Sequence, residues 1–282
     1  MMKGRKGSTK RGCHLKYYLL DRGDDESRQL AENFHQLAIA RGLQCSEEAP
    51  DVVVSIGGDG TMLHAFHQFH KQLDEIAFVG IHTGHLGFYA DWKPDELAML
   101  IQMMADAGSL HDRVVKYPLL RIELTTEQGV QSFLALNEFT LKGANATLVA
   151  QLNINDAEFE MFRGDGICIS TPSGSTAYNK SLNGALLHPS LDAIQIAEIA
   201  SINNRVYRTV GSSLVLPKHH HCDILPRKDQ ELLLTIDHLM IPYSKIMNIR
   251  SMVADQKVTF ARYRPFPFWE RVREAFIRND VY

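Results

Sequence analysis

The chain contains little cysteine, and its four thiols, Cys13, Cys45, Cys168 and Cys222, form no Cys-x-x-Cys pair. Scattered cysteines in a chain of 282 residues favour free thiols in a reducing compartment over a disulfide framework. No apolar stretch approaches the roughly 20 residues that a membrane-spanning helix needs. The sequence also lacks Gly-Lys-Ser and Gly-Lys-Thr, which excludes a P-loop.

Neither sign of charge is in large excess. Lys+Arg at 30 against Asp+Glu at 33 gives a net charge of -3, which shows none of the basic footprint of a nucleic-acid-binding protein. The first residues are basic and have no apolar core, so they do not form a secretory signal. We therefore expect a cytoplasmic protein that binds neither nucleic acid nor a membrane, with a disordered basic tail over residues 1–14.

Strands and helices alternate in the first part of the chain. Short β-favouring runs are followed by segments with apolar residues at helical spacing, and these patterns end at glycines. Alternation of this kind predicts a doubly wound parallel sheet, so we assign residues 15–115 to an α/β domain. The predicted strands and helices cover residues 15–20, 24–42, 52–56, 76–81 and 94–108.

The second part of the chain has short apolar runs with polar breaks. This spacing predicts a mostly antiparallel β domain over residues 116–262, interrupted by one helix at residues 191–200. Residues 263–282 contain a further helical pattern at 268–276, and we expect this segment to pack back on the first domain. The predicted strands cover residues 119–125, 133–136, 139–141, 147–154, 159–162, 167–170, 213–216, 232–236 and 258–261.

The motif Gly57-Gly58-Asp59-Gly60-Thr61 joins a predicted strand end to a helix start. Glycines let a ligand approach the backbone closely, and a helix start offers free N–H groups to phosphate. The carboxylate of Asp59 would repel that phosphate, unless it binds a metal, holds a sugar hydroxyl or removes a proton. An ordinary turn explains the motif alone equally well. The third glycine of the dinucleotide fingerprint is missing, which disfavours a hydride-transfer Rossmann enzyme.

Three further polar segments follow predicted strands. In Leu136-Asn137-Glu138-Phe139 the amide can pair with a base edge and the carboxylate with ribose hydroxyls, although an exposed strand end is the plainer alternative. Arg163-Gly164-Asp165-Gly166 is a second glycine-flanked acid, or a turn with a local ion pair. Residues 171–181 carry several hydroxyl groups around one glycine, followed by Tyr178, and they offer hydrogen-bond donors and a stacking face.

The thirteen histidines do not make a zinc pattern. His64, His67 and His70 could share one helix face, but no Glu or Cys completes a ligand set. Residues 219–222 lie between two prolines, where we expect a loop rather than a metal site. The sequence therefore predicts no structural metal.

In this order the segments strongly resemble the NAD kinases, in particular the branch found in Gram-positive bacteria. The resemblance covers about residues 15–278. Gly-Gly-Asp-Gly alone also occurs in lipid kinases and phosphofructokinases, whereas the full ordered set does not. The matching stretches are residues 57–61, 80–89, 136–138, 162–166, 170–183, 200–205 and 236–238.

The resemblance implies that the α/β domain binds nucleotide, that the β-rich domain binds NAD, and that the dinucleotide lies between the two. It also implies that the enzyme transfers a phosphoryl group from ATP, or polyphosphate, to the 2′-hydroxyl of the adenosine ribose, producing NADP. It implies that Asp59 is the general base, that Mg2+ accompanies the donor, and that the enzyme is a homo-oligomer, either a homodimer or a homotetramer. Some of the binding residues are implied to act across a subunit interface. The nucleotide-binding residues that it implies are Gly60, Tyr89, Asn137, Glu138, Arg163, Asp165, Ser173, Thr176, Ala177, Tyr178, Asn179, Lys180, Ser181, Ala200 and His238.

Two rival functions are weighed against this one. A lipid or sugar-phosphate kinase with the same glycine motif is the enzymatic rival, but a lipid kinase would show an apolar or basic membrane face that the composition does not suggest. A sensor that binds NAD or NADP without turnover is the rival from another class. Asp59 discriminates against the sensor, because a carboxylate aimed at the 2′-hydroxyl would only hinder binding of a phosphate there.

Overall fold

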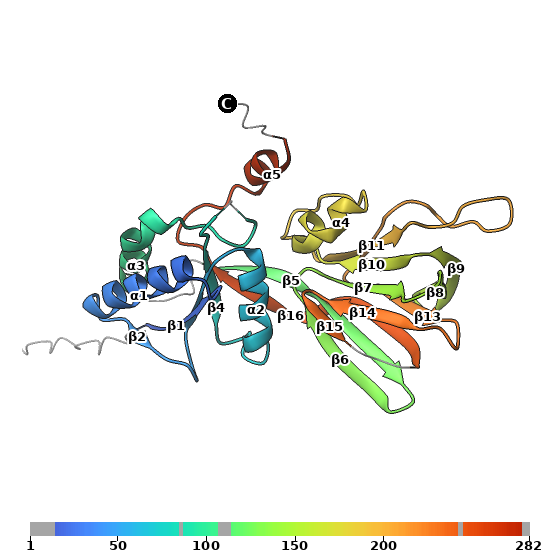
Figure 1. The fold of residues 1–282 in the computed structure, drawn as a ribbon, viewed down its shortest axis with the longest axis horizontal. Coiled ribbons are helices and arrows are strands. Elements are labelled where there is room, and N and C mark those ends of the chain that lie inside the picture. Colours follow the sequence, from blue (N-terminus) through green and yellow to red (C-terminus); the bar gives the residue numbers. More distant parts are fainter. Residues whose placement is uncertain (1–14, 85–86, 107–113, 242–244, 278–282) are drawn as a thin grey trace, which may run out of the picture.

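The computed structural model describes residues 15–84, 87–106, 114–241 and 245–277, and it has an α/β half and a β-rich half that lie side by side (Figure 1). The basic tail predicted at residues 1–14 lies outside the described residues. The mixture of a parallel sheet and an antiparallel β region confirms the predicted fold class.

The α/β half is built on four parallel neighbouring strands in the order β2, β1, β3, β4. Every residue of β3 and β4 is buried, as expected for strands covered on both faces. Helices α1 and α3 cover one face and α2 covers the other. The elements are β1 (Lys16–Asp21), α1 (Asp25–Ala40), β2 (Gln44–Cys45), β3 (Val52–Ile56), α2 (Asp59–Phe69), β4 (Ala77–Ile81), the 3-10 turn η1 (Pro94–Glu96) and α3 (Leu97–Asp106).

The start of α1 shows why the sequence folds this way locally. The Asp24 side chain accepts a hydrogen bond from the backbone N–H of Ser27 at 3.0 Å, which caps the helix. Leu30, Phe34 and Ala38 follow at intervals of four residues and are buried against the sheet. The helix therefore begins and faces the core where the sequence pattern predicts.

The β-rich half packs a sheet of the order β12-β11-β10-β7-β14-β15 against the antiparallel part of the larger sheet. Apolar side chains from both sheets fill the space between them. The strands are β5 (Val114–Thr126), β6 (Gly129–Ala135), β7 (Glu138–Gly143), β8 (Leu148–Ile154), β9 (Ala157–Gly164), β10 (Gly166–Ser170), β11 (Ala193–Ile199), β12 (Leu214–Pro217), β13 (His221–Pro226), β14 (Leu232–Ile236), β15 (Leu239–Ile241) and β16 (Ile246–Ala261).

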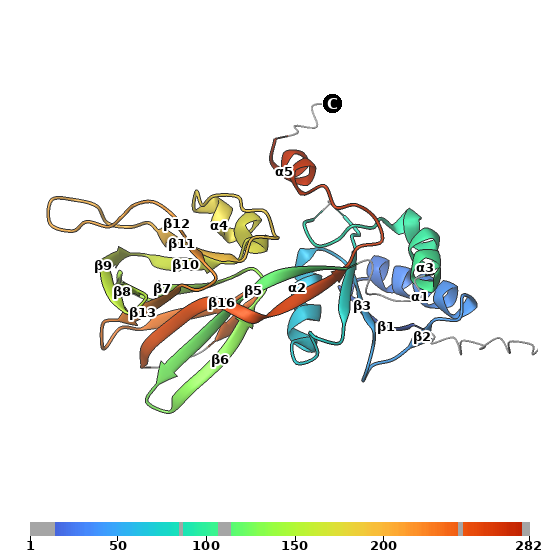
Figure 2. The ribbon, with the colours of Figure 1, turned by 180° about the vertical axis from the view of Figure 1, so that it is seen from behind.

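Strand β16 joins the two halves into one continuous sheet. It pairs antiparallel with β5 and β13 in the β-rich half, and its residue Phe260 pairs in parallel with Phe78 of β4. Figure 2 shows β16 and β5 crossing from one half to the other. The domain boundaries predicted near residues 115 and 262 remain predictions, because these two strands run through the junction.

The helix predicted at residues 191–200 is wrong, because this segment forms strand β11. The strand pairs antiparallel with β10 and β12. Its apolar residues lack a clear alternation because both faces are buried, with Ile194 and Ile196 in the main β-rich core and Ala197 in a smaller cluster behind. A short run buried on both sides resembles a buried helix in sequence.

The loop predicted at residues 219–222 is also wrong in part, because His221 and Cys222 begin strand β13. Pro226 is the last residue of this strand and pairs with Ala150 of β8. The sequence also did not predict β2, β15 or the first part of β16. Short strands and strands rich in polar residues give a weak sequence signal.

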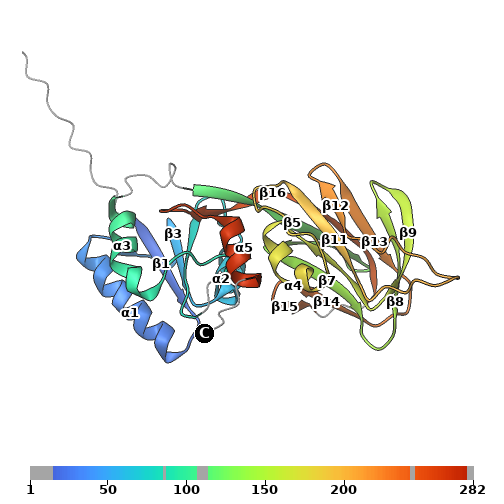
Figure 3. The ribbon, with the colours of Figure 1, turned by 90° about the horizontal axis from the view of Figure 1, so that it is seen from above.

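The chain returns to the first half in helix α5 (Phe268–Phe276), which agrees with the predicted helix. Figure 3 shows α5 above the junction of the two halves, close to the short helix α4 (Tyr178–Ser181). Lys180 of α4 lies 4.4 Å from the ring centroid of Phe276, so the two helices are in contact. None of the helices in the described ranges is long and apolar enough to cross a lipid bilayer.

Val258 tests how much the joining strand contributes to stability. Its side chain on β16 is 0% exposed, whereas Val130 on β6 is 65% exposed. We expect Val258→Ala to lower the free energy of unfolding by about 1.5–3 kcal/mol, through lost burial and a residual cavity. The matched change Val130→Ala should cost less than about 0.5 kcal/mol. Denaturant unfolding measures both, and equal costs would contradict a buried role for β16.

Candidate active site

The glycine motif forms the junction between strand β3 and helix α2. Gly57 has a backbone φ of +152°, which favours glycine, and a Cβ there would collide with the Thr61 side chain. Gly58 is the N-cap of α2, and the helix begins at Asp59. The free N–H groups of the first turn therefore face the end of the parallel sheet, where open α/β folds bind ligands.

The carboxylate of Asp59 is held by the backbone of a distant loop. It accepts hydrogen bonds from the N–H groups of Phe88 at 2.9 Å and Tyr89 at 3.0 Å. Burial raises the pKa of this carboxyl, while the two N–H groups and the guanidinium of Arg271 oppose the rise. Asp59 is therefore a stronger base than a solvated aspartate, yet the backbone bonds favour its charged form.

The loop at residues 87–91 is held close to Asp59 by a glycine and by an arginine of α5. A Cβ at Gly87 would lie 2.6 Å from Cγ of Asp59, so only glycine allows this approach. The buried guanidinium of Arg271 on α5 donates to the carbonyl oxygens of Gly87 at 2.9 Å and Ala90 at 2.7 Å. Asp91 pairs with Arg271 and Arg262. The C-terminal helix therefore holds the loop that supplies the N–H groups to Asp59.

The turn at residues 136–138 faces the same junction from the β-rich half. The carboxylate of Asp237 accepts from the N–H groups of all three residues, at 2.9, 2.7 and 3.2 Å in chain order. Tyr89 is 2% exposed and donates its hydroxyl proton to Oδ1 of Asn137 at 2.5 Å. Tyr89 thus links the loop beside Asp59 to Asn137, and its burial assigns it a positioning role.

Glu138 carries an unusual protonation state for a glutamate. Burial, and then the charge of Asp237, raise the pKa of Glu138 to about 8, while the backbone N–H of Tyr178 opposes the rise. Its Oε2 atom is buried and has no hydrogen-bond partner among the residues that the structure describes. A protonated carboxyl at this position can donate to a ligand as well as accept from one.

Residues 171–181 pack against this turn. Thr171 and Ser173 both donate their hydroxyl protons to the carbonyl oxygen of Leu136. Thr176 donates to the carbonyl of Ser173, and Ala177 lies between the 3-10 turn η3 (Ser173–Thr176) and α4. These hydroxyl groups therefore shape the loop itself.

Helix α4 carries the remaining predicted residues of this segment. The Tyr178 hydroxyl accepts from Nζ of Lys142 at 2.9 Å, and its ring is half-buried. Asn179 is 0% exposed and donates to the carbonyl of Ser175, so it supports the loop from inside. The ammonium group of Lys180 lies over the ring of Phe276 on α5, and Ser181 is exposed at the end of the helix. Tyr178 therefore offers a half-buried ring near the 136–138 turn, whereas the ring of Tyr89 there is buried.

A cleft of about 820 Å³ opens beside the start of α2. The first turn lines one wall through Gly58, Gly60 and Thr61. His238 reaches it from the β-rich half, and its ring lies 3.9 Å from that of His64, centroid to centroid. Burial and these neighbouring histidines lower the pKa of His238. The other lining residues are Leu20, Asp21, Arg22, His64, His67, Gln68 and Leu239.

Three predicted residues lie away from Asp59 within one chain. Arg163, Asp165 and Ala200 cluster where β9, β10 and β11 end, with the guanidinium of Arg163 over the ring of Tyr207 at 4.3 Å. The N–H of Asp165 donates to the carbonyl of Ile199, and both the binding role of this segment and the alternative of a turn with a local ion pair remain predictions. Strand β10 separates this cluster from the 136–138 turn by roughly 16 Å.

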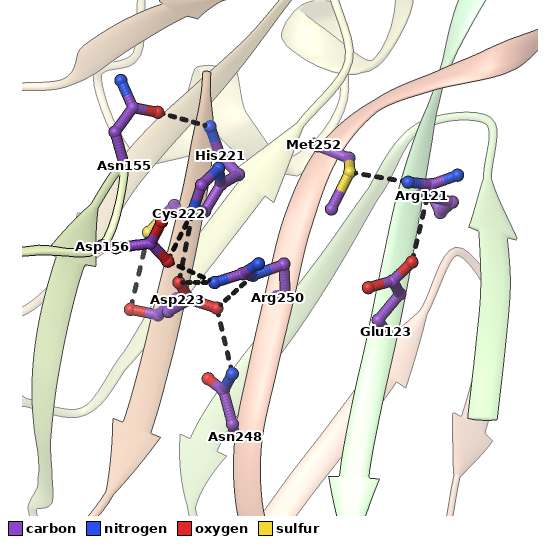
Figure 4. A network of polar contacts seen from close by, with 10 residues as sticks. All are labelled: Arg121, Glu123, Asn155, Asp156, His221, Cys222, Asp223, Asn248, Arg250 and Met252. Carbon is purple, nitrogen blue, oxygen red and sulfur yellow. Dashed lines mark hydrogen bonds and ion pairs between the residues drawn. The ribbon is translucent and has the colours of Figure 1, made fainter. Parts of the chain in front are cut away.

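One group of side chains in the described part of the chain has the spacing of metal ligands. The ligand atoms of Asp156, His221 and Asp223 lie within 4.8 Å of one another. Figure 4 shows the guanidinium of Arg250 among them, bonded to Asp223 at 2.8 and 2.9 Å and to Asp156 at 2.6 Å. Since an arginine already neutralises these carboxylates, a dication would have to displace it. Ion pairing across β13 and β16 explains the group without a metal.

Sequence reasoning missed the residues that act through long-range contacts. Asp237 lies 100 positions from Asn137, and Arg271 lies 184 positions from Gly87. His64 was weighed only as a metal ligand. The sequence Ile236-Asp237-His238 between two apolar runs indicates a hairpin tip, but it carries no information about the backbone that the carboxylate binds.

Comparison with known sequences places this arrangement in a family. Residues 20–108 match the profile of the ATP-NAD kinase N-terminal domain, and residues 136–261 match that of the ATP-NAD kinase C-terminal domain. The chain is 52% identical over 268 residues to NAD kinase 1 of Halalkalibacterium halodurans, covering 94% of this chain and 100% of the relative. It is also 52% identical over 267 residues to the NAD kinase of Geobacillus stearothermophilus, covering 94% and 97%.

The chain therefore belongs to the NAD kinase family, whose reaction is the phosphorylation of NAD to NADP. The predicted resemblance is confirmed, as is its Gram-positive branch.

Solved structures share the fold. A yeast NADH kinase complexed with NADH superimposes with a TM-score of 0.79 at 18% identity, covering 95% of this chain and 89% of that one. An NAD kinase from Archaeoglobus fulgidus in complex with ATP gives a TM-score of 0.70 at 18% identity, covering 93% and 97%.

Two glycines of one loop test the contact with Asp59. We expect Gly87→Ala to push the backbone away from the carboxylate and to lower kcat for NADP formation by about tenfold or more, because small displacements of reacting groups are costly. At Gly84 a Cβ would meet nothing within 4 Å. Gly84→Ala should therefore keep the parental rate. Parental activity of the Gly87 variant would contradict the close approach.

Glu138 predicts a pH dependence of stability. Because its pKa is raised to about 8, the folded state binds a proton that the unfolded state releases above about pH 4.5. Stability should fall as the pH rises from 5 to 8, by on the order of 3 kcal/mol from this group. In Glu138→Gln this contribution disappears, so its melting temperature should depend less on pH. Glu158→Gln, at an exposed position, is the control. Equal slopes in parent and Glu138→Gln would refute the assignment.

Proposed function

We propose that the chain transfers the terminal phosphoryl group of ATP, or of polyphosphate, to the 2′-hydroxyl of the adenosine ribose of NAD. The observation that carries the proposal is the position of the Asp59 carboxylate. It lies at a helix start suited to phosphate and is linked through Tyr89 to Asn137 on the opposite half. A base between a phosphate site and a dinucleotide site is what this transfer requires.

The phosphoryl donor occupies the cleft at the start of α2 in this proposal. The backbone N–H groups near Gly58 and Gly60 and the guanidinium of Arg22 offer positive charge to its phosphates. Mg2+ accompanies the donor and neutralises charge on the transferred group. Magnesium prefers oxygen ligands and is commonly held by substrate phosphates and one or two carboxylates, and Asp21 supplies a carboxylate in this cleft.

Asp59 acts as the general base on the acceptor side. Its carboxylate removes the proton of the 2′-hydroxyl while the hydroxyl oxygen attacks the terminal phosphorus of ATP. The bond between this phosphorus and the bridging oxygen breaks, and ADP leaves with the electron pair on that oxygen. The raised pKa of Asp59 makes this proton transfer more favourable, because a general base works best when its pKa approaches the working pH. Positioning and charge neutralisation supply the rest of the rate.

The dinucleotide binds along the turn and the loop that face Asp59. Asn137 and the protonated Glu138 hold its base or sugar groups, and the ring of Tyr178 stacks on a base. Ser173, Thr176 and Ala177 line this pocket, and Asn179 with Tyr89 supports it from behind. The remaining members of the set are Gly60, Lys180, Ser181 and His238, which border the cleft or α4.

The enzyme works as a homo-oligomer, a homodimer or a homotetramer, in the cytoplasm. Arg163, Asp165 and Ala200 lie too far from Asp59 to serve it within one chain, so we assign them to the site of a neighbouring subunit. The exposed apolar side chains of Val206 and Val210, at 77% and 44%, follow Ala200 in sequence and offer a surface for that contact.

A direct assay tests the function. NAD and NADH are offered as acceptors with ATP and Mg2+, with ATP alone or with polyphosphate, and formation of NADP or NADPH is followed by a coupled reaction. Asp59→Asn should lower kcat by about a hundredfold or more with a KM for NAD within about threefold, because the loss falls on the proton transfer. Asp25→Asn, on the exposed side of α1, should match the parent. An Asp59→Asn enzyme as fast as the parent would remove the base from the mechanism.

A further inference from the structure

His67 and Asp237 form a direct polar contact between the two halves of the molecule. The Nε2 atom of His67 lies 2.7 Å from Oδ2 of Asp237. The carboxylate side chain is 0% exposed and the imidazole is 17% exposed. Hydrogen bonds to a charged, buried acceptor are among the stronger ones in proteins.

Each partner of this contact is rigidly joined to one side of the active site. His67 lies on α2, the helix that begins with Asp59, and the helical segment from Asp59 to His67 spans roughly 12 Å as a stiff rod. Asp237 occupies the two-residue turn between β14 and β15, with a backbone φ of +50°. Its carboxylate binds the backbone at residues 136–138, and its own N–H donates to the carbonyl of Glu138 at 2.9 Å.

We propose that the His67–Asp237 contact sets the distance and angle between the base Asp59 and the turn that carries Asn137 and Glu138. His67 and Asp237 are positioning residues that touch neither substrate at the reacting atoms. The inference rests on the proposed reaction, in which the base and the acceptor hydroxyl come from opposite halves.

The contact adds a directed polar link to apolar packing between the halves on this side, where Met62 and Phe66 of α2 belong to the same buried core as Leu136. The ring of His238 also lies against those of His64 and His67. Strand β16 passes through the junction, but its pairing register with β5 shifts between Val253 and Lys257, where the strands bend. The Tyr89–Asn137 bond joins the halves on the face of the loop at residues 87–91. The His67–Asp237 contact is the counterpart at the other end of α2, so the two bonds together restrict rotation of the halves.

The clefts beside α2 support this placement. His67 and Leu239 border both the cleft at the start of α2 and a second one of about 720 Å³ near the helix end. The contact therefore lies at the partition between two open spaces. Without it, water would reach the Asp237 carboxylate from either side and compete for the hydrogen bonds to the backbone.

Two substitutions at His67 and one control separate a positioning role from a merely structural one. His67→Phe keeps a ring of similar size and removes the donor, whereas His67→Gln restores an N–H donor. His70→Phe is the control, because His70 is on the same helix end, is exposed, and bonds only to the carbonyl of His67 among its described hydrogen bonds. The measured quantities are kcat, KM for NAD and KM for ATP in NADP formation.

We expect His67→Phe to lower kcat by about ten- to a hundredfold, as for a small displacement of a base from its reactant, with both KM values within about threefold. His67→Gln should recover most of this loss, and His70→Phe should behave like the parent. Parental kcat in His67→Phe overturns the inference. Equal losses in the Phe and Gln variants also overturn it, as does a loss confined to KM for ATP, since that marks a donor contact.

A second measurement does not depend on catalysis. Amide hydrogen exchange at residues 136–138, without substrates, should be faster in His67→Phe than in the parent and in His70→Phe, because the carboxylate that binds these amides loses its anchor. Unchanged exchange contradicts the contact. If the parent makes no NADP, the proposed function fails, while the exchange data still decide whether His67 holds Asp237 in place.

Discussion

A carboxylate removed from water needs partners, and this requirement organises the structure around Asp59. The partners are two backbone N–H groups from residues 88 and 89, which reach the carboxylate only because Gly87 has no side chain. Unlike side-chain donors, backbone N–H groups cannot change rotamer. Their position is therefore set by the contacts that hold the loop in place. The arginine of α5 holds it on one side, and the stacking of Tyr89 on Phe260 of β16, with ring centroids 5.6 Å apart, holds it on the other.

The two halves of the fold divide the chemistry between them. The parallel half provides a helix start and the buried carboxylate of Asp59, at the carboxyl ends of the strands where open α/β sheets bind ligands. The β-rich half provides an amide, a protonated glutamate and an aromatic ring on short connections between strands. The contacts that cross the junction, such as Tyr89–Asn137 and His67–Asp237, hold these two sets of groups together. Buried carboxylates serve as the fixed points on both sides, Asp59 on one and Asp237 on the other.

Local pattern explains which parts of this arrangement the sequence could predict. The buried run at residues 52–56, the glycine motif and the helix at 268–276 each leave a signature within about ten residues, and all three were predicted correctly. The helix prediction for strand β11 is wrong because a strand buried on both faces lacks the alternation of apolar and polar residues that identifies a half-buried strand. The roles of Asp237 and Arg271 could not be predicted, since their partners lie 100 and 184 positions away. The family resemblance supplied the base and the binding residues, which remain predictions.

The hydrogen bonds from Arg271 to the carbonyl groups of Gly87 and Ala90 have a consequence for biosynthesis. A ribosome adding roughly 5–20 residues each second needs on the order of 10–40 s to travel from the loop to this arginine. During that interval the parallel strands and α2 already exist, but the carbonyl groups of Gly87 and Ala90 lack the guanidinium that binds them in the complete protein. The loop that faces Asp59 therefore gains its full set of contacts only after α5 has been synthesised.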